Sequence, residues 1–360
     1  MPSTAPVLPP PSSFTPSAHR AATVQQLQSN LSTSFALLLL EADNLLISST
    51  SGLRVAGLND LLIVDRQEEN NASTTLQPTL LHTTSVITSP LPSYDCIPSP
   101  DSSTIYSASE SGINIFNTKD LLQTNNNAVP KHTFQTHPSP FETSIEVNSL
   151  YISPSSTLYS ACGDLFGLYS YSTAKPQFLK NTQPSQGYLH TVTGYDNIVC
   201  WGGEDGIVWL MDERTSSIIS LNIKDYLTSI HKSSKSQHVY ISSILIKHPF
   251  LYVSGGIESS HNITQSGYIC SVYLPSRTFL GGRRLRRLLI GEKLLRLIEG
   301  ELCGTGRSGS IVRWSPELKV IKEGKGEGEG WDLVGWKNGV IKCGGRGEVF
   351  EDYRICGHID

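Results

Sequence analysis

The residues able to bind a metal or carry catalysis are spread along the chain instead of being clustered. The ten histidines and seven cysteines include no His-x-x-x-His and no Cys-x-x-Cys pair, two spacings that zinc sites use. The chain also lacks a G-x-S-x-G motif, a P-loop and the protein-kinase set of motifs. The sequence therefore predicts no catalytic residue, no metal site and no cofactor.

Two short motifs suggest chemistry but have simpler interpretations. Glu204 and Asp205 are adjacent carboxylates, yet neighbouring residues point to opposite faces of a strand, and the flanking glycines favour a solvated hairpin turn. Residues 304–309 (GTGRSG) have the letters of the dinucleotide-binding motif G-x-G-x-x-G. They lie between two expected strands, not between a strand and a helix, so they predict a hairpin turn instead.

The strongest local charge is a basic stretch at residues 283–296 (RRLRRLLIGEKLLR). One interpretation is a site for RNA phosphates, an acidic partner or an anionic membrane. The other is a solvated outer strand or a connection between strands. Both stay open on the sequence alone. The basic residues are Arg283, Arg284, Arg286, Arg287, Lys293 and Arg296.

The amino-acid composition argues against some classes of function. The 28 Lys and Arg residues are balanced by 32 Asp and Glu residues, a net charge of −4, which argues against a free-standing nucleic-acid binder. No apolar run approaches the roughly 20 residues that a membrane-spanning helix needs. The odd number of cysteines and the absence of close pairs predict reduced thiols, buried in strands, in a cytosolic or nuclear protein.

The pattern of apolar residues predicts an all-β protein. Residues 1–20 are rich in Pro, Ser and Thr and predict a disordered arm, and the helix formers of residues 20–30 predict a short helix. From Ser34 to Val349, short apolar runs alternate with turns of Gly, Ser, Asp and Asn, which is typical of many short strands. Two long polar segments, residues 66–83 and 118–140, are interpreted as loop insertions.

One pattern recurs seven times: a strand ending in small residues, a tight polar turn closing on glycine, and a further apolar strand. Successive closing glycines lie about 49 residues apart on average, and a four-stranded propeller blade takes roughly 40–50 residues. Glycine suits such a turn because the turn requires a positive φ, and small residues before it let blades pack closely. Residues 21–357 are therefore predicted to form a seven-bladed β-propeller, with a strand from residues 22–40 completing the last blade. The closing glycines are Gly52, Gly112, Gly167, Gly206, Gly267, Gly309 and Gly347.

The repeat at residues 187–217 is the most regular and follows the order of a WD repeat. Met211 stands in the place of the signature tryptophan. We assign a structural role in the blade turn to Gly202, Gly203, Asp205, Gly206 and Asp212. The other members of the pattern are His190, in the outer region of the blade, and Asp196, in the turn before a strand.

Two segments resemble the THO complex subunit 6 family of WD-repeat proteins. They are residues 141–164 (FETSIEVNSLYISPSSTLYSACGD) and 201–223 (WGGEDGIVWLMDERTSSIISLNI). In that family a "TS-E-V-E/I-N-L" segment leads into one blade, and the next blade carries "SGGEDG-V-LWD-RT". The residues that match the first element are Thr143, Ser144, Glu146, Val147 and Asn148, and those that match the second are Gly202 to Gly206, Asp212, Arg214 and Thr215.

The resemblance implies a non-catalytic scaffold subunit of the THO/TREX complex, acting in nuclear mRNA processing and export. Its partners would be other THO/TREX subunits, with mRNA reached indirectly and with neither a membrane nor a small-molecule substrate involved. A WD-repeat adaptor of another complex, such as a ubiquitin-ligase substrate receptor or a ribosome-assembly factor, stays open as the alternative. An enzyme is disfavoured because no chemical constellation is present. The candidate partner-binding residues are Trp209, Arg214, Arg283, Arg284, Arg286 and Arg287.

Overall fold

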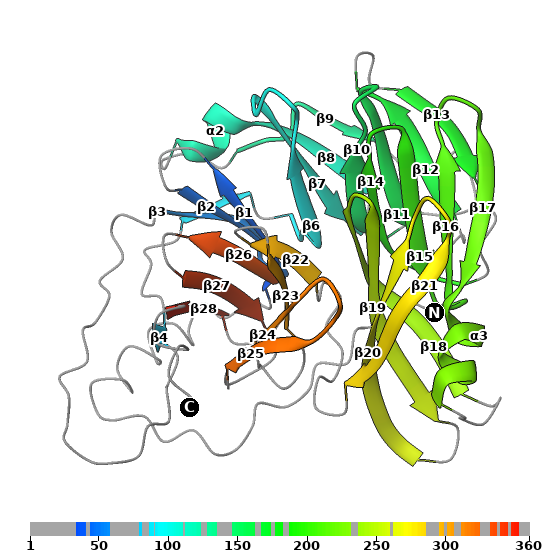
Figure 1. Ribbon diagram of the computed structural model, residues 1–360. Coiled ribbons are helices and arrows are strands. Elements are labelled where there is room, and N and C mark those ends of the chain that lie inside the picture. Colours follow the sequence, from blue (N-terminus) through cyan, green and yellow to red (C-terminus); the bar gives the residue numbers. More distant parts are fainter. Residues whose placement is uncertain are drawn as a thin grey trace, which may run out of the picture.

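The computed structural model describes most of the chain between Ser34 and Asp352. Its described residues form seven four-stranded antiparallel sheets and two short helices (Figure 1), which confirms the all-β prediction. The predicted arm at residues 1–20 and the predicted helix at residues 20–30 lie outside these residues. The described residues are 34–40, 44–57, 79–80, 86–89, 91–110, 112–123, 128–134, 146–162, 167–173, 177–182, 187–231, 237–259, 262–285, 295–298, 301–305, 311–324, 332–336, 339–344 and 347–352.

Sheets are numbered here in the order in which the chain enters them. Sheet 1 contains β1 (Ser34–Leu40), β2 (Asn44–Ser49), β3 (Gly52–Gly57) and β5 (Val86–Ser89). Sheet 2 contains β6 (Asp95–Pro98), β7 (Thr104–Ser109), β8 (Gly112–Asn117) and β9 (His132–Phe134). Sheet 3 contains β10 (Val147–Ile152), β11 (Thr157–Cys162), β12 (Gly167–Ser172) and β13 (Gln177–Thr182).

The remaining sheets follow the same plan. Sheet 4 contains β14 (Leu189–Tyr195), β15 (Ile198–Gly203), β16 (Ile207–Asp212) and β17 (Ser217–Asn222). Sheet 5 contains β18 (Gln237–Lys247), β19 (Phe250–Ser259), β20 (Asn262–Tyr273) and β21 (Thr278–Leu285). Sheet 6 contains β22 (Leu295–Ile298), β23 (Glu301–Thr305), β24 (Ile311–Trp314) and β25 (Val320–Gly324). Sheet 7 contains β26 (Asp332–Trp336), β27 (Gly339–Gly344), β28 (Gly347–Asp352) and β4 (Thr79–Leu80).

The core consists of apolar layers, each lying between two consecutive sheets. The layer between sheets 3 and 4, for example, contains Tyr159 and Leu168 from one sheet and Val199 and Trp201 from the other. In β2, β7, β11 and β15, every residue after the first is buried, because the second strand of a sheet is covered on both faces. The edge strand β17 buries only Leu221. The face-to-face packing therefore explains the continuous apolar runs of the second strands.

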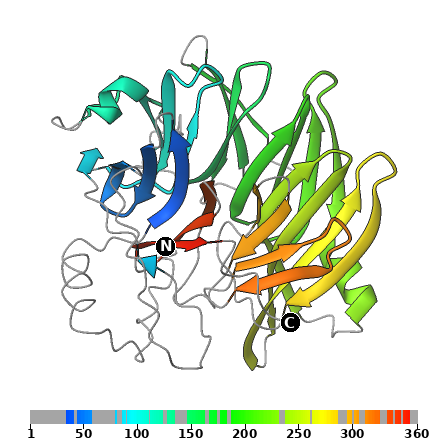
Figure 2. The same ribbon diagram turned by 60° about the vertical axis from the view of Figure 1, so that its left-hand side comes forward.

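The sheets follow one another in cyclic order. The first strand of each sheet contacts the first strand of the next, in the series β1, β6, β10, β14, β18, β22 and β26, and β26 contacts β1 again. In Figure 2 the red strands of sheet 7 accordingly lie beside the blue strands of sheet 1.

A buried carboxylate joins the two ends of this series. Asp332 in β26 is fully buried and accepts a hydrogen bond from the Leu37 N–H of β1 through Oδ2 (2.9 Å). The Arg296 guanidinium of β22 donates to both carboxylate oxygens at 2.8 and 2.9 Å. Asp332 thus links sheets 6, 7 and 1. Asp95 in β6 makes a similar link, because its Oδ2 accepts the Leu150 N–H of β10 at 2.9 Å.

The closing strand of sheet 7 differs from the prediction. The segment expected to complete the last repeat, residues 22–40, instead supplies β1 of sheet 1, as far as it is described. The run SFALLLL pairs with the neighbouring β2, which requires closure of only a short loop. Sheet 7 takes its fourth strand from β4, where Thr79 and Leu80 pair with Phe350 and Val349.

The two segments interpreted as insertions also contain regular structure. Residues 66–83 include β4, and residues 118–140 include the helix α2 (Thr118–Leu122) and β9. Asn117 caps α2, because its side chain accepts a hydrogen bond from the Lys119 N–H at 3.0 Å. The second helix, α3 (Ile223–His231), follows β17. No helix among the described residues is long and apolar enough to cross a membrane.

The repeated glycine does close several of the turns. Gly52 and Gly112 begin the third strands of sheets 1 and 2 with φ of 112° and 130°, a region that favours glycine. The preceding Ser49 and Ser109 each donate from Oγ to the glycine carbonyl, at 2.7 and 2.9 Å. Gly267 is a correction: it lies within β20, paired with Gly256, and the β19–β20 hairpin continues beyond it to the Ser259–Asn262 pair.

The remaining glycines and the cysteines agree with the sequence as far as they are described. Gly167 and Gly347 begin β12 and β28, whereas Gly309 lies outside the described residues, in the segment between the paired strands β23 and β24. The cysteines whose surroundings are described are buried and carry reduced thiols: Cys96, Cys162, Cys200, Cys270 and Cys303.

We expect Asp332→Ala to lower the free energy of unfolding by about 3 kcal/mol, because it leaves the buried Leu37 N–H and the Arg296 guanidinium without their acceptor. Urea denaturation followed by tryptophan fluorescence measures the change. Asp101→Ala is the control, since Asp101 accepts its hydrogen bonds within an exposed turn. Equal losses in the two variants would contradict the linking role of Asp332.

Candidate functional site

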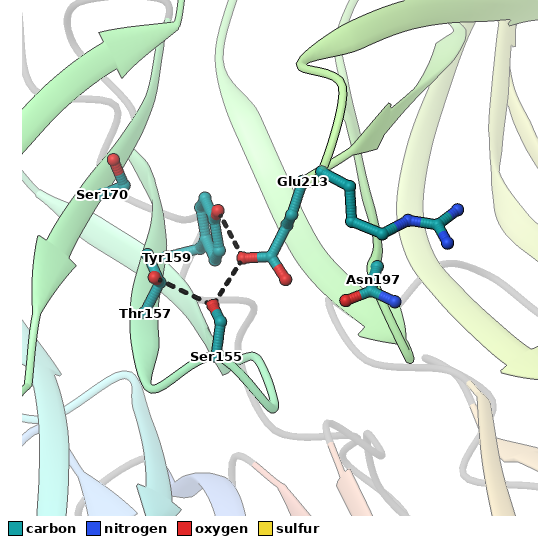
Figure 3. Close-up of a pocket in the computed structure, with 7 residues that line it drawn as sticks. Ser155, Thr157, Tyr159, Ser170, Asn197 and Glu213 are labelled. Atoms are coloured by element: carbon teal, nitrogen blue, oxygen red, sulfur yellow. Dashed lines mark hydrogen bonds between the residues drawn. The ribbon is translucent and has the colours of Figure 1, made fainter.

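A pocket of about 470 Å³, lined by residues with polar side chains, opens between sheets 3 and 4. Strand-connecting turns of both sheets meet here: the β10–β11 turn of sheet 3, and the β14–β15 and β16–β17 turns of sheet 4. Figure 3 shows Tyr159 and Ser155 on one side and Glu213 facing them from the other. The lining residues are Ser155, Thr157, Tyr159, Ser170, Asn197, Glu213 and Arg214.

Local hydrogen bonds hold the turns that carry these side chains. The β10–β11 turn is closed by the Ser156 N–H donating to the Ser153 carbonyl at 2.9 Å, with Ser156 at a φ of 61°. In sheet 4, the Glu213 N–H donates to the Asn197 carbonyl at 2.8 Å. This bond joins the β14–β15 turn to the β16–β17 turn, so Asn197 and Glu213 are held together.

Glu213 is the centre of the pocket. Its Oε1 accepts hydrogen bonds from the Tyr159 hydroxyl at 2.7 Å and the Ser155 hydroxyl at 3.1 Å, both from sheet 3. Its Oε2 is buried and meets no hydrogen-bond donor among the described residues. One carboxylate oxygen of Glu213 therefore accepts hydrogen bonds, and the other accepts none from the described residues.

Burial and the Glu213 charge keep the neighbouring tyrosines protonated. Burial is the main cause that raises the pKa of Tyr159, and its hydrogen bond to Glu213 adds to the effect. Burial, with a smaller contribution from Glu213, raises the pKa of Tyr151 to about 12. The Tyr159 hydroxyl therefore acts as a hydrogen-bond donor to Glu213 at neutral pH.

Arg214, the cation in the pocket lining, is already bound by a carboxylate. Its Nε and Nη2 donate to the two oxygens of Asp212 at 3.1 and 2.8 Å, and its backbone N–H also binds Asp212. The Arg214 side chain and backbone hydrogen bonds lower the pKa of Asp212 to about 2. Since this pair is neutral, the described lining keeps the single negative charge of Glu213.

Of the predicted blade-turn residues, Asp205 and Gly206 lie in the β15–β16 turn, whereas Gly202 and Gly203 end β15 and Asp212 ends β16. Glu204 and Asp205 occupy the β15–β16 turn, which confirms the turn interpretation. Asp205 accepts the Ile207 N–H and the Trp209 indole N–H, each at 3.0 Å. Asp212 ends β16 and binds Arg214.

Two of the predicted glycines lie in close contacts, one with backbone and one with a side chain. A Cβ on Gly203 would lie 1.8 Å from the Tyr188 carbonyl oxygen, where a bulge in β14 brings the backbones together. A Cβ on Gly202 would lie 3.0 Å from Ile241 of sheet 5. Gly203 is therefore small because of contacts within sheet 4, whereas Gly202 allows the close packing of neighbouring sheets.

The four predicted partner-binding residues that the structure describes are not brought together. Arg214 lines the pocket, whereas Trp209 is half-buried and bound to Asp205 at the other end of β16. Arg283 and Arg284 lie on β21, the outer strand of sheet 5. Arg286 and Arg287 lie outside the described residues.

His190 and Asp196 do not form a WD-type hydrogen bond within the described part of the chain. They lie near opposite ends of β14, about 20 Å apart along an extended strand. His190 instead lies near the Tyr240 ring, with a centroid distance of 6.0 Å.

The sequence analysis missed Ser155, Tyr159 and Glu213. Tyr159 and Glu213 are separated by 54 positions, and they meet because consecutive sheets pack face to face. No local spacing could signal this pair. In the described residues, no group of three or more His, Cys, Asp or Glu side chains is placed to hold a metal ion.

Comparison with known proteins gives a likeness in fold only. No protein-family model and no curated protein sequence matches the chain. A solved structure that it resembles is the computationally designed Ika8 protein, with a TM-score of 0.54 and 12% sequence identity. The match covers 89% of this chain and 96% of the designed chain. It is a likeness of architecture.

Gly206→Val should lower the free energy of unfolding by about 1–3 kcal/mol. Gly206 has a φ of 69°, and a Cβ there would lie 2.7 Å from the Val239 carbonyl oxygen. Thermal unfolding measures the effect. Gly281→Val is the matched control, because a Cβ at Gly281 meets nothing within 4 Å. A melting temperature of the Gly206 variant equal to that of the control would mean that the turn is wrongly assigned.

Stability should fall on acidification because of His190. Burial, and to a lesser degree His238, lowers the pKa of His190 from 6.5 to about 4. The unfolded chain therefore takes up a proton below pH 6.5 that the folded chain does not, and up to about 3 kcal/mol is lost between pH 6.5 and 4. Urea midpoints at pH 7 and pH 5 should differ less in His190→Asn than in the wild type. The same difference in both proteins would refute the assignment.

Proposed function

We propose that this protein is a seven-bladed WD-repeat β-propeller that serves as a non-catalytic scaffold subunit of the THO/TREX complex. Each four-stranded sheet would be one blade. The observation that carries the architecture is the cyclic series of contacts between first strands, which returns from β26 to β1. Radial repetition of this kind leaves only short sheet edges and presents many turns for binding other proteins.

Two segments that carry the family resemblance meet in space, which supports the proposal. Asn148, from the first segment, donates from Nδ2 to the Leu189 carbonyl of β14 at 2.8 Å. Leu189 pairs with Gly203, from the GGEDG turn of the second segment. The neighbouring Val147 is fully buried at the start of β10. The described residues of the two elements therefore meet at the boundary between sheets 3 and 4, a reason for them to occur together.

The proposed partners are other THO/TREX subunits in the nucleus, with mRNA contacted indirectly through the complex. The net charge of −4 supports a protein-binding role over direct capture of RNA phosphates. Side chains that line the pocket between sheets 3 and 4 offer hydroxyl, amide and charged groups for such contacts. No cofactor, membrane or small-molecule substrate enters the proposal.

Affinity purification of the tagged chain from nuclear extract of its source organism tests the function. Recovery of the large THO subunits in stoichiometric amounts is expected. Recovery of a cullin adaptor or of pre-ribosomal proteins in their place would favour the alternative adaptor roles and overturn the THO assignment.

Charge reversal tests the basic stretch as a docking site. Replacing Arg283, Arg284, Arg286 and Arg287 together by Glu should reduce recovery of at least one partner about fivefold, because an acidic partner would then be repelled. The melting temperature should stay near the wild-type value, since two of these residues lie on an outer strand. The four Arg→Lys changes form the charge-preserving control. Unaltered recovery of every partner would discard this stretch as a docking surface.

A further inference from the structure

We propose that the pocket between sheets 3 and 4 binds the cationic end of an arginine or lysine side chain from a partner protein, with Glu213 as the counter-ion. This inference rests on the proposed protein-binding function for the source of the cation. It does not depend on which complex the partner belongs to.

The first argument is the unequal state of the two Glu213 oxygens. Oε1 is fully engaged by the Tyr159 and Ser155 hydroxyls. Oε2 is buried and meets no donor in the described structure, and a buried acceptor without a donor is costly. An N–H group that enters the pocket and displaces the atoms covering Oε2 would complete the carboxylate. A charged N–H donor would do so most strongly, because charge-assisted hydrogen bonds are about twice as strong as neutral ones.

The second argument is the charge of the lining. Arg214 could in principle neutralise Glu213, but its guanidinium is held by both oxygens of Asp212. Tyr159 stays protonated because its pKa is raised. Asp212 lies outside the lining but neutralises Arg214, so the pocket and this pair together carry the single negative charge of Glu213, which favours a cation and repels phosphate or carboxylate groups.

The third argument is size and shape. The pocket volume of about 470 Å³ lies within the roughly 300–1,000 Å³ typical of small-ligand sites and exceeds what one guanidinium group fills. The hydroxyls of Ser155 and Thr157 and the amide of Asn197 line the pocket together with the carboxylate. These groups can accept the remaining N–H bonds of a guanidinium. The aromatic ring of Tyr159 offers an apolar wall for the methylene stem.

Binding of n-butylguanidinium and of its uncharged analogue n-butylurea to the purified full chain tests the site. Isothermal titration calorimetry at low salt should show at least a fivefold tighter association of the cation. Glu213→Gln keeps an oxygen for Tyr159 but removes the charge, and it should abolish this preference. Equal binding of the two probes, or a preference that survives Glu213→Gln, would overturn the proposal.

A matched control is available in sheet 2. Glu110 accepts the Tyr94 hydroxyl at 2.7 Å, the same distance as the Tyr159–Glu213 bond, but at an exposed position. Glu110→Gln removes the same charge and should leave the fivefold preference intact. Loss of the preference in this variant as well would show that general charge, not the pocket, attracts the cation.

A second variant keeps the test valid if Glu213→Gln does not fold. The Arg214 side chain is 68% exposed, so Arg214→Ala should leave the fold intact. It releases the Asp212 carboxylate and should tighten n-butylguanidinium binding at least twofold. Unchanged or weaker binding would contradict a site that selects cations by its negative charge.

The source of the cation is tested with N-acetylarginine N-methylamide and with spermidine. The arginine derivative should bind at least as tightly as n-butylguanidinium. Spermidine binding more than tenfold tighter than the arginine derivative would overturn the assignment to a protein side chain. A negative result in these binding assays would contradict the cation site but would not change the co-purification result. The cation site and the scaffold function are therefore tested independently.

Discussion

The buried carboxylate of Asp332 is the constraint on which the order of the sheets depends. A desolvated charge is tolerated only when hydrogen bonds surround it, and here two donors come from the Arg296 guanidinium and two from the backbone of Leu37 and Leu333. These donors lie in three different sheets. The carboxylate is satisfied only when the last sheet lies against both the sixth and the first. The apolar layers alone do not impose this order, because hydrophobic packing is not directional and allows two sheets to pack in many relative positions.

The pocket between sheets 3 and 4 depends on the same kind of close packing. Tyr151 of β10 fits against Gly194 of β14, where a Cβ would lie 2.4 Å from the tyrosine ring. This approach brings the Tyr159 hydroxyl within 2.7 Å of Glu213 across the boundary between the sheets. The pocket is therefore a property of how two repeats meet. Neither repeat contains it alone.

The strands and turns could largely be predicted from the sequence, whereas the pocket between sheets 3 and 4 could not. Apolar strands, polar turns and glycines such as Gly52 and Gly112 act over a few residues, so their pattern predicts local structure directly. Gly267 was wrongly predicted to close a turn, because the β19–β20 hairpin extends past it. A few residues of sequence around this glycine do not reveal the length of the hairpin. Glu213 and Tyr159 belong to different repeats, and only tertiary packing brings them together. The role of the basic stretch could not be decided from the sequence for the same reason, because Arg296 donates its hydrogen bonds to Asp332 in the next sheet.

The fourth strand of sheet 7 gives one polar stretch an unexpected constraint. β4 comes from the connection between β3 and β5, and two residue pairs attach it to β28 among the described residues. A shorter connection would keep the strands of sheet 1 but would remove β4, the edge strand of sheet 7, whose other strands come from the C-terminal part of the chain. During evolution, its length would then be under selection even where its residue identities drift freely.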